Sequence, residues 1–196
     1  GAVAAWSKIN KDYGSLDLSE ILKPAIELAE KGYVVADVIA DMWEREKDKL
    51  QKDKDCKRIF LRDGSPYLAG DLHFQPELAM TMKEICSFGK EGFYQGWVAE
   101  DIVRKLNNIG GKHTLKDFSD LKIEYVNPIS TTYKDYEVFE CPPNGQGIVA
   151  LMMLNIISNF NLSSFGPDDY ERIHLEAEAS KIAFQHRNKF LGDPRF

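Results

Sequence analysis

A short turn rich in proline and glycine, Pro142-Pro143-Asn144-Gly145-Gln146-Gly147, separates two segments of opposite character. The segment before it, 136–141, has the composition of a strand, and the apolar segment after it, 148–157, predicts a helix. The two prolines end the strand because neither can donate a ladder hydrogen bond. The glycines allow positive φ and close backbone approach at the helix start, where free amides attract anions. The turn therefore predicts either a ligand cradle or simply a tight strand-to-helix connection.

Helical periodicity dominates the first part of the chain. Apolar spacing over 17–31 predicts a helix whose first turn carries Asp17 as N-cap and Glu20 as the matching acid. Pro24 lacks the N–H that an intrahelical bond needs, so we expect a short turn to end near Leu22 and a second helix to begin at Pro24. Further helices are predicted over 36–50, 76–88, 91–107, 147–160 and 167–190, the last opening with Pro167-Asp168-Asp169.

The hydrophobic period changes to that of strands before the glycine-rich turn. Residues 122–133 and 136–141 are rich in Ile, Val, Thr and Tyr, and Lys134-Asp135 between them predicts the turn of a β-hairpin. The helix over 147–160 is apolar nearly all round, which predicts burial on several sides. The sequence therefore predicts an α+β fold, predominantly helical with a β-hairpin, in a single domain or domain fragment that covers residues 1–196.

Composition limits which classes of partner and which cellular compartment are expected for this chain. The formal net charge of −6 and the lack of a Lys/Arg block argue against nucleic acid. The longest apolar run, 148–157, is well short of the roughly 20 residues that span a bilayer, so we expect no membrane partner. Cys56, Cys86 and Cys141 form no Cys-x-x-Cys pair, which predicts no metal site and reduced thiols in a cytoplasmic protein.

The stretch from Gly145 to Ala150 matches the dinucleotide fingerprint G-x-G-x-x-A, with an acid about 20 residues further on at Asp168. Its context does not fit, because two prolines separate strand from glycine and the preceding strands predict an antiparallel hairpin. A nucleotide-binding domain is therefore the weaker alternative, and no cofactor is predicted.

Other groups that could carry chemistry have simpler explanations. His174 with Glu176 and Glu178 lacks the second histidine or the cysteines of a zinc site, so a helix surface is predicted. Thr131 and Thr132 lie inside the predicted hairpin, whereas a nucleophilic threonine that uses its own amine as base must be a chain terminus. From the residues alone, we identify no catalytic side chain and no metal ligand.

A series of short motifs runs along nearly the whole chain in a fixed order. They are Gly1-Ala-Val-Ala-Ala-Trp6, Tyr13-Gly14-Ser-Leu16, Leu22-Lys-Pro-Ala-Ile26-x-Leu-Ala29-x-x-Gly32, Gly70-Asp-x-x-x-Gln75-Pro76-x-Leu-Ala79-x-Thr81, Phe93-Tyr94-x-Gly96, Gly110-Gly111-x-x-Thr114-x-x-Asp117, 142–147, His174-x-x-x-Glu178-Ala-x-Lys181-x-Ala183-Phe-x-x-Arg187 and Leu191-Gly-Asp-Pro-x-Phe196. In this order the chain resembles the γ-glutamyltranspeptidase family of N-terminal-nucleophile hydrolases. The form of the 142–147 turn is similar to that of its acylase-like branch.

The resemblance implies that the chain is most of the large subunit of a precursor that cuts itself, within an αββα sandwich. The partner would be the small catalytic subunit, whose new N-terminal threonine lies beyond Phe196 and attacks a γ-glutamyl amide such as glutathione, or another amide. It implies no catalytic residue in this chain, and Asn144, Gly145 and Gln146 as candidates near the substrate cleft. The alternative in another class is a non-catalytic helical interaction module.

Overall fold

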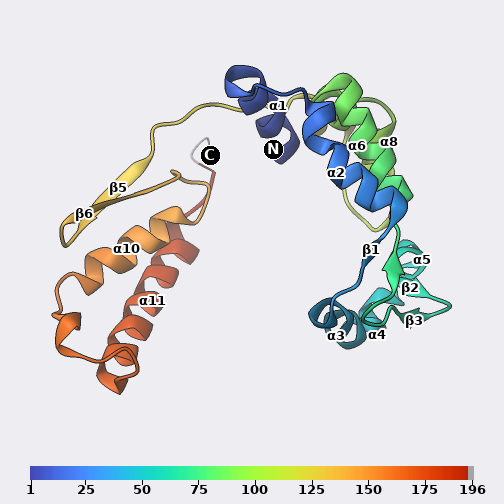
Figure 1. Cartoon of the computed structure of the whole chain (residues 1–196). Helices are drawn as coiled ribbons and strands as arrows, with labels where there is room; N and C mark the ends of the chain where they lie inside the picture. Colours follow the sequence, from blue (N-terminus) through green and yellow to red (C-terminus); the bar gives the residue numbers. More distant parts are fainter. Residues whose placement is uncertain (194–196) are drawn as a thin grey trace. The chain divides into compact units, whose positions relative to one another are not determined.

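The computed structural model describes residues 1–193, and the chain divides into two compact units, Gly1–Ile123 and Glu124–Phe196 (Figure 1). The first unit contains α1 (Ala2–Tyr13), α2 (Leu18–Lys31), β1 (Tyr33–Val34), α3 (Asp37–Arg45), α4 (Lys47–Leu50), α5 (Lys54–Phe60), β2 (Leu61–Arg62), β3 (Ser65–Pro66), β4 (Leu72–His73), α6 (Pro76–Phe88), α7 (Glu91–Tyr94), α8 (Gly96–Asn108) and α9 (Leu115–Ser119). The second contains β5 (Ile129–Tyr133), β6 (Tyr136–Glu140), α10 (Gly147–Ile157), the 3-10 turn η1 (Leu162–Ser164) and α11 (Tyr170–Phe190). The described part of the chain is thus mostly helical with short strands, as predicted. That the two units act as one domain stays a prediction.

Helix α2 is continuous, so the predicted break at Pro24 is wrong. The predicted acid at the third position is confirmed, since the N–H of Asp17 donates to Glu20 Oε2 at 3.3 Å. Pro24 leaves the carbonyl of Glu20 without its intrahelical donor. Both residues are exposed, so water can bond that carbonyl. Packing of α2 along α6 then outweighs the loss of one hydrogen bond.

Two other predicted helices are each divided in the structure. The helix predicted over 91–107 becomes α7 and α8, because Gly96 has φ +64° after an extended Gln95. That conformation is disfavoured for residues with a Cβ, and the helix cannot continue through it. The helix predicted over 36–50 becomes α3 and α4, which meet at Glu46 with φ −95° and ψ 5°.

A small lobe is inserted between α2 and α6. We call residues 37–67, with α3, α4, α5 and the β2–β3 hairpin, the 37–67 lobe. Its two ends join the antiparallel pair β1–β4 (Figure 1). In this pair Tyr33 lies opposite His73. Asp63 and Gly64 form the turn between the paired strands β2 and β3, and both residues have positive φ.

The second unit consists of the β5–β6 hairpin, with α10 packed against it and against α11. The predicted hairpin is confirmed, with Tyr133 opposite Tyr136, but residues 122–128 are not part of its first strand. Pro128 directly precedes β5, and its missing N–H limits pairing there. Ile157, Leu162 and Ala179 form a core between α10, η1 and α11.

Both long helices of this unit are shorter than predicted. Helix α10 ends at Ile157, because Ser158 Oγ and Asn159 Nδ2 donate to the carbonyl of Asn155 at 2.8 and 2.9 Å and satisfy it from the side chains. Helix α11 begins at Tyr170, so Pro167-Asp168-Asp169 precede it rather than forming its first turn. Asp169 Oδ2 accepts the N–H of Gly166 at 2.7 Å and thereby fixes the approach to the helix.

Candidate functional site

The turn between β6 and α10 brings the end of the strand against the start of the helix. A Cβ atom on Gly147 would lie 2.7 Å from Cβ and Oε2 of Glu140 and 3.0 Å from the carbonyl oxygen of Cys141. These distances are shorter than ordinary nonbonded contacts, so glycine alone permits the approach. At Gly145 the nearest neighbour of a Cβ would be the carbonyl oxygen of Pro142, at 3.9 Å. The predicted close backbone approach is therefore confirmed at Gly147 and not at Gly145.

Neither glycine of this turn has positive φ, so that part of the prediction is wrong. The N-cap residue Gln146 has φ −91° and ψ 6°, and its carbonyl accepts the N–H of Val149 at 2.9 Å. A turn with these angles needs no left-handed residue. Glycine is thus needed at position 147 because a side chain would not fit there, and not because of its backbone angles.

The sequence-predicted cleft residues Asn144, Gly145 and Gln146 lie together on this turn, and all three are exposed. The first turn of α10 has no acidic residue, and Gln146 makes no side-chain cap. Free amides therefore leave partial positive charge at this helix end. The half-buried Glu140 lies beside it and offsets part of that charge. The turn can donate backbone amides to a polar ligand, and its place at a substrate cleft stays a prediction.

The nucleotide alternative gains no support from the surroundings of this turn. Strand β6 pairs antiparallel with β5, and each sheet among residues 1–193 is an antiparallel pair. After α10 the chain enters η1 and α11 rather than a second parallel strand. A dinucleotide-binding unit requires that parallel strand next to the first.

Thr131 and Glu178, which belong to the groups that could carry chemistry, have ordinary structural partners. Thr131 lies in β5, and its Oγ1 donates to Asn155 Oδ1 on α10, which ties the hairpin to the helix. Glu178 accepts a hydrogen bond from Lys181 at 2.7 Å, which lowers the pKa of the Glu178 carboxyl. His174 is exposed on the same helix. The helix-surface interpretation of this group therefore agrees with the structure.

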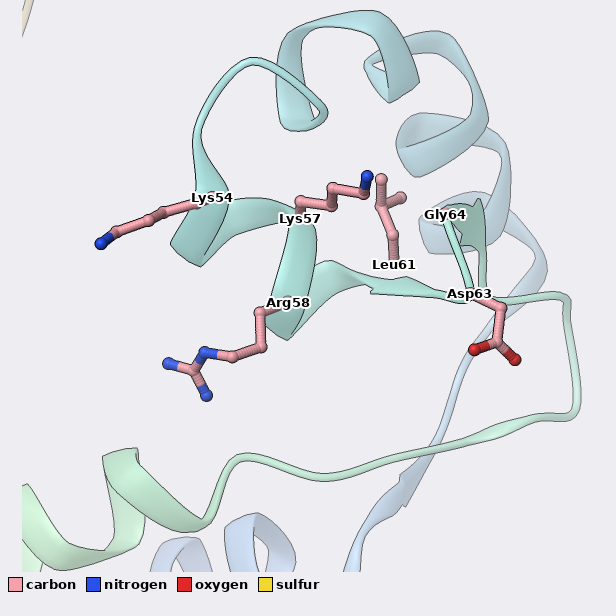
Figure 2. A pocket seen from close by; sticks show the side chains of 6 residues that line it. All are labelled: Lys54, Lys57, Arg58, Leu61, Asp63 and Gly64. Atoms are coloured by element: carbon pink, nitrogen blue, oxygen red, sulfur yellow. The ribbon is translucent and has the colours of Figure 1, made fainter.

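A basic hollow that the sequence did not indicate lies at α5 and the β2–β3 turn (Figure 2). It has a volume of about 440 Å³ and is lined by Lys54, Lys57, Arg58, Leu61, Asp63 and Gly64. Figure 2 shows Lys57 running toward Leu61, whereas Lys54 and Arg58 point away from it. The Arg58 guanidinium already donates twice to Glu77, at 2.7 and 3.0 Å. Because the cations do not converge, this hollow lacks the geometry of an anion site.

Cysteines and acidic groups do not assemble into a metal centre in the described structure. Cys56 and Cys86 are half-buried, Cys141 is exposed, and all three are free thiols. Burial raises the pKa of the Cys56 and Cys86 thiols, which keeps them protonated at neutral pH. Within residues 1–193 no three His, Cys, Asp or Glu side chains are grouped to hold a metal ion. The cytoplasmic location stays a prediction.

No helix in the described part of the chain is both long and apolar enough to cross a bilayer.

The protein class follows from comparison with known families. A family model described as Gamma-glutamyltranspeptidase matches residues 1–196. The chain therefore belongs to the gamma-glutamyltranspeptidase family.

Named relatives share this family over the whole of the chain. The chain is 34% identical over 198 residues to the glutathione hydrolase proenzyme of Escherichia coli, covering 100% of this chain and 34% of that protein. It is 34% identical over 198 residues to the capsule biosynthesis protein CapD proenzyme of Bacillus anthracis, covering 100% of this chain and 36% of that protein. The chain thus spans about a third of the length of these curated relatives.

Solved structures agree with the family assignment. The gamma-glutamyltranspeptidase of Helicobacter pylori superposes with a TM-score of 0.90 at 32% identity, over 100% of this chain and 57% of that chain. The cephalosporin acylase of Bacillus halodurans superposes with a TM-score of 0.88 at 34% identity, over 98% of this chain and 37% of that chain. The resemblance predicted from the ordered motifs is confirmed.

Proposed function

We propose that these 196 residues are a large-subunit portion of an autoprocessed amide hydrolase and acyltransferase. The observation that carries the proposal is the match of the family model to residues 1–196. The named relatives from Escherichia coli and Bacillus anthracis are both proenzymes, which supports a precursor that is cut into two subunits. In this proposal the partner is a small catalytic subunit from the same precursor.

The proposed reaction is acyl transfer through a covalent intermediate. The N-terminal threonine of the small subunit attacks the amide carbonyl, and the amine leaves as the acyl-enzyme forms. Water or an amino-acid amine then attacks the ester carbonyl and restores the threonine hydroxyl. The substrate class is a γ-glutamyl amide such as glutathione, or a related amide, since the names of the similar proteins include both glutathione hydrolase and cephalosporin acylase.

The role proposed for this chain is to support the catalytic subunit and to shape part of the cleft. The β5–β6 hairpin and the helices would contribute to an αββα sandwich, and α10 would carry the 144–146 turn to the cleft. Glu140 against Gly147 fixes where that turn leaves the strand. Exposed amides at the turn suit a polar end of the substrate.

Expression of the complete reading frame that contains this chain tests the proposal. We expect the precursor to split into two polypeptides, with threonine as the first residue of the smaller one. The cleaved protein should release product from a γ-glutamyl anilide. A precursor that stays intact and inactive would favour the non-catalytic helical interaction module instead. Saturable nucleotide binding would favour a nucleotide-binding domain.

A further inference from the structure

His73 on β4 is buried without any polar partner. None of its surface is exposed, and neither ring nitrogen has a hydrogen-bond partner among the described residues. A neutral imidazole has one N–H donor and one nitrogen acceptor, so both are left unsatisfied here. Buried polar groups are nearly always bonded, and an exception points to strain or to a role.

Aromatic rings surround this imidazole on several sides. His73 lies 4.8 Å from Tyr67 and 4.9 Å from Trp43, measured between ring centroids and with edge contacts. It lies 5.5 Å from Tyr33 in an edge contact, and 5.9 Å from Phe60 in a stacked one. We call these five side chains the His73 cluster. Its rings accept a neutral imidazole well but provide no carboxylate or carbonyl for a protonated one.

The His73 cluster joins the 37–67 lobe to the rest of the first unit. Trp43 lies in α3, Phe60 in α5 and Tyr67 at the end of the lobe, whereas Tyr33 and His73 belong to the β1–β4 pair. That pair is also where the chain enters and leaves the lobe (Figure 1). The state of one imidazole therefore bears on how firmly the whole lobe is held.

Charged groups near the cluster do not compensate an imidazolium. The titratable side chains in ring contact with His73 are the phenols Tyr33 and Tyr67. Arg62 lies over the Tyr67 ring at 5.1 Å and is paired with Asp71. The exposed charged residues of the neighbouring elements are Asp37, Asp41, Glu44 and Arg45 of α3 and Lys54, Lys57 and Arg58 of α5. Burial is the cause that lowers the pKa of His73.

We propose that His73 is an acid-sensitive latch: in mildly acidic solution its imidazole takes up a proton, leaves the His73 cluster for water, and releases the 37–67 lobe from the β1–β4 pair. Protonation forms one N–H bond with a proton from solvent and breaks no covalent bond. The folded site disfavours the charged ring. The lobe is therefore firmly held at pH values above the ordinary histidine pKa, and it loosens as the pH falls below that value. The opened lobe would expose the hydrophobic faces of Trp43 and Phe60.

Hydrogen exchange by mass spectrometry on the complete protein tests the latch. Peptides from the 37–67 lobe are compared at about pH 7.5 and about pH 5, with rates corrected for the intrinsic effect of pH. One linked proton raises the opening constant by up to about 30-fold over this range. In His73→Phe, which keeps a flat ring and removes the titration, the opening constant should stay within about twofold. The exposed His113, changed to Phe in the same unit, is the matched control and should keep the rise of the parent.

Equal protection of the parent lobe at both pH values would overturn the latch, and so would a His73→Phe variant that still opens in acid. If His73→Phe fails to fold, the latch is tested by NMR in the parent protein, where the ring protons of His73 report the protonation of its imidazole as the pH is lowered. A ring that stays neutral until the lobe opens supports the latch. A ring that titrates with an ordinary pKa while 37–67 stays protected refutes it. The test does not involve amide hydrolysis, so it stands apart from the proposed function.

Discussion

Lys105 Nζ of α8 lies 2.5 Å from Asp53 Oδ2, and Asp53 is the N-cap residue of α5. The same ammonium donates to Asp55 at 2.7 Å. The other oxygen of Asp53 accepts the N–H groups of Asp55 and Cys56 at 2.9 and 3.0 Å. One lysine thus connects α8 to the capped start of α5 and supports the 37–67 lobe from outside it.

We expect Lys105→Met to loosen α5, because the cap of this helix loses the cation that holds its carboxylate. The change in Tm should be small and should shrink in high salt, since these side chains are solvent-accessible. Thermal unfolding followed by circular dichroism measures it. Lys57→Met is the matched control, because Lys57 lies on α5 and has no ion pair within residues 1–193. An equal loss in both variants would contradict the role of Lys105.

The pH dependence of this group has a definite sign. The hydrogen bond from Lys105, followed by the Cys56 N–H, lowers the pKa of Asp53 below its ordinary value of 3.8. Such a carboxyl stabilises the fold above its unfolded pKa and loses that contribution as pH falls through the folded value. The pKa of Lys105 is raised above 10.5 by Asp53 and then Asp55, so its contribution is lost only in strong alkali. The difference between Lys105→Met and parent should therefore stay constant near neutral pH and decline below about pH 4.

Gly147→Ala should destabilise the second unit. The added Cβ meets Glu140 at 2.7 Å and the Cys141 carbonyl oxygen at 3.0 Å, so the strand end and the helix start must separate. We expect a loss of about 1–3 kcal/mol in the free energy of unfolding, measured in urea. Gly145→Ala is the control, because a Cβ there meets nothing closer than 3.9 Å. Similar losses for both glycines would show that the close approach at Gly147 does not set the effect, because the entropy term of a Gly→Ala change is stabilising.

Asn144→Ala and Gln146→Ala test whether the turn lines the cleft. Both side chains are exposed, so neither change should alter the Tm by a measurable amount. In the complete, cleaved enzyme we expect KM for a γ-glutamyl anilide to rise by about threefold to tenfold while kcat changes less. The exposed Asn161, changed to Ala outside the turn, serves as the comparison. Unchanged KM in both turn variants would place the cleft elsewhere.

The isolated chain should be inactive as an amidase. In the proposed mechanism, the nucleophilic threonine and the groups that stabilise the oxyanion belong to the small subunit. The purified 196-residue chain should therefore release no product from a γ-glutamyl anilide, and adding the small subunit should restore release. Measurable turnover by the chain alone would contradict the assignment of the catalytic groups to the small subunit.

Local signals predicted those elements whose ends are set by local chemistry. Thr114 caps α9 by accepting from the Asp117 N–H, and the Thr-x-x-Asp spacing is by itself typical of such a cap. Helix α6 begins at Pro76 and ends before Gly89, again as predicted. In each case the residues that start and stop the helix lie within the segment itself, so the sequence alone contains the information.

Features that depend on distant contacts could not be predicted in the same way. Pro24 is a helix breaker by local rules, yet α2 packs along α6 and continues through it. The surroundings of His73 come from residues 33–67, and no periodicity reveals that their rings meet around one imidazole. At the candidate site, the glycine pattern predicted a close approach but could not tell Gly147, which needs it, from Gly145, which does not.

Helix α10 provides the sharpest test of how much of this chain is covered by other polypeptide. Leu151 is buried within its own unit, whereas Leu154 is only half-buried there. A carboxylate at position 151 would be a buried, unpaired charge that costs at least about 3 kcal/mol, enough to prevent folding and self-cleavage of the precursor. We expect Leu154→Asp in the complete precursor to be equally damaging, because polypeptide outside this chain should cover the remaining face of α10.

Asn155→Asp is the matched control on the same helix. Asn155 is exposed, and an aspartate there can still accept the hydrogen bond from Thr131. This variant should fold and split into two chains like the parent, as seen on a denaturing gel. Normal maturation of Leu154→Asp beside a failed Leu151→Asp would mean that α10 is covered by its own unit alone. Normal maturation of both would mean that the helix is peripheral, and the scaffold role proposed for it would be wrong.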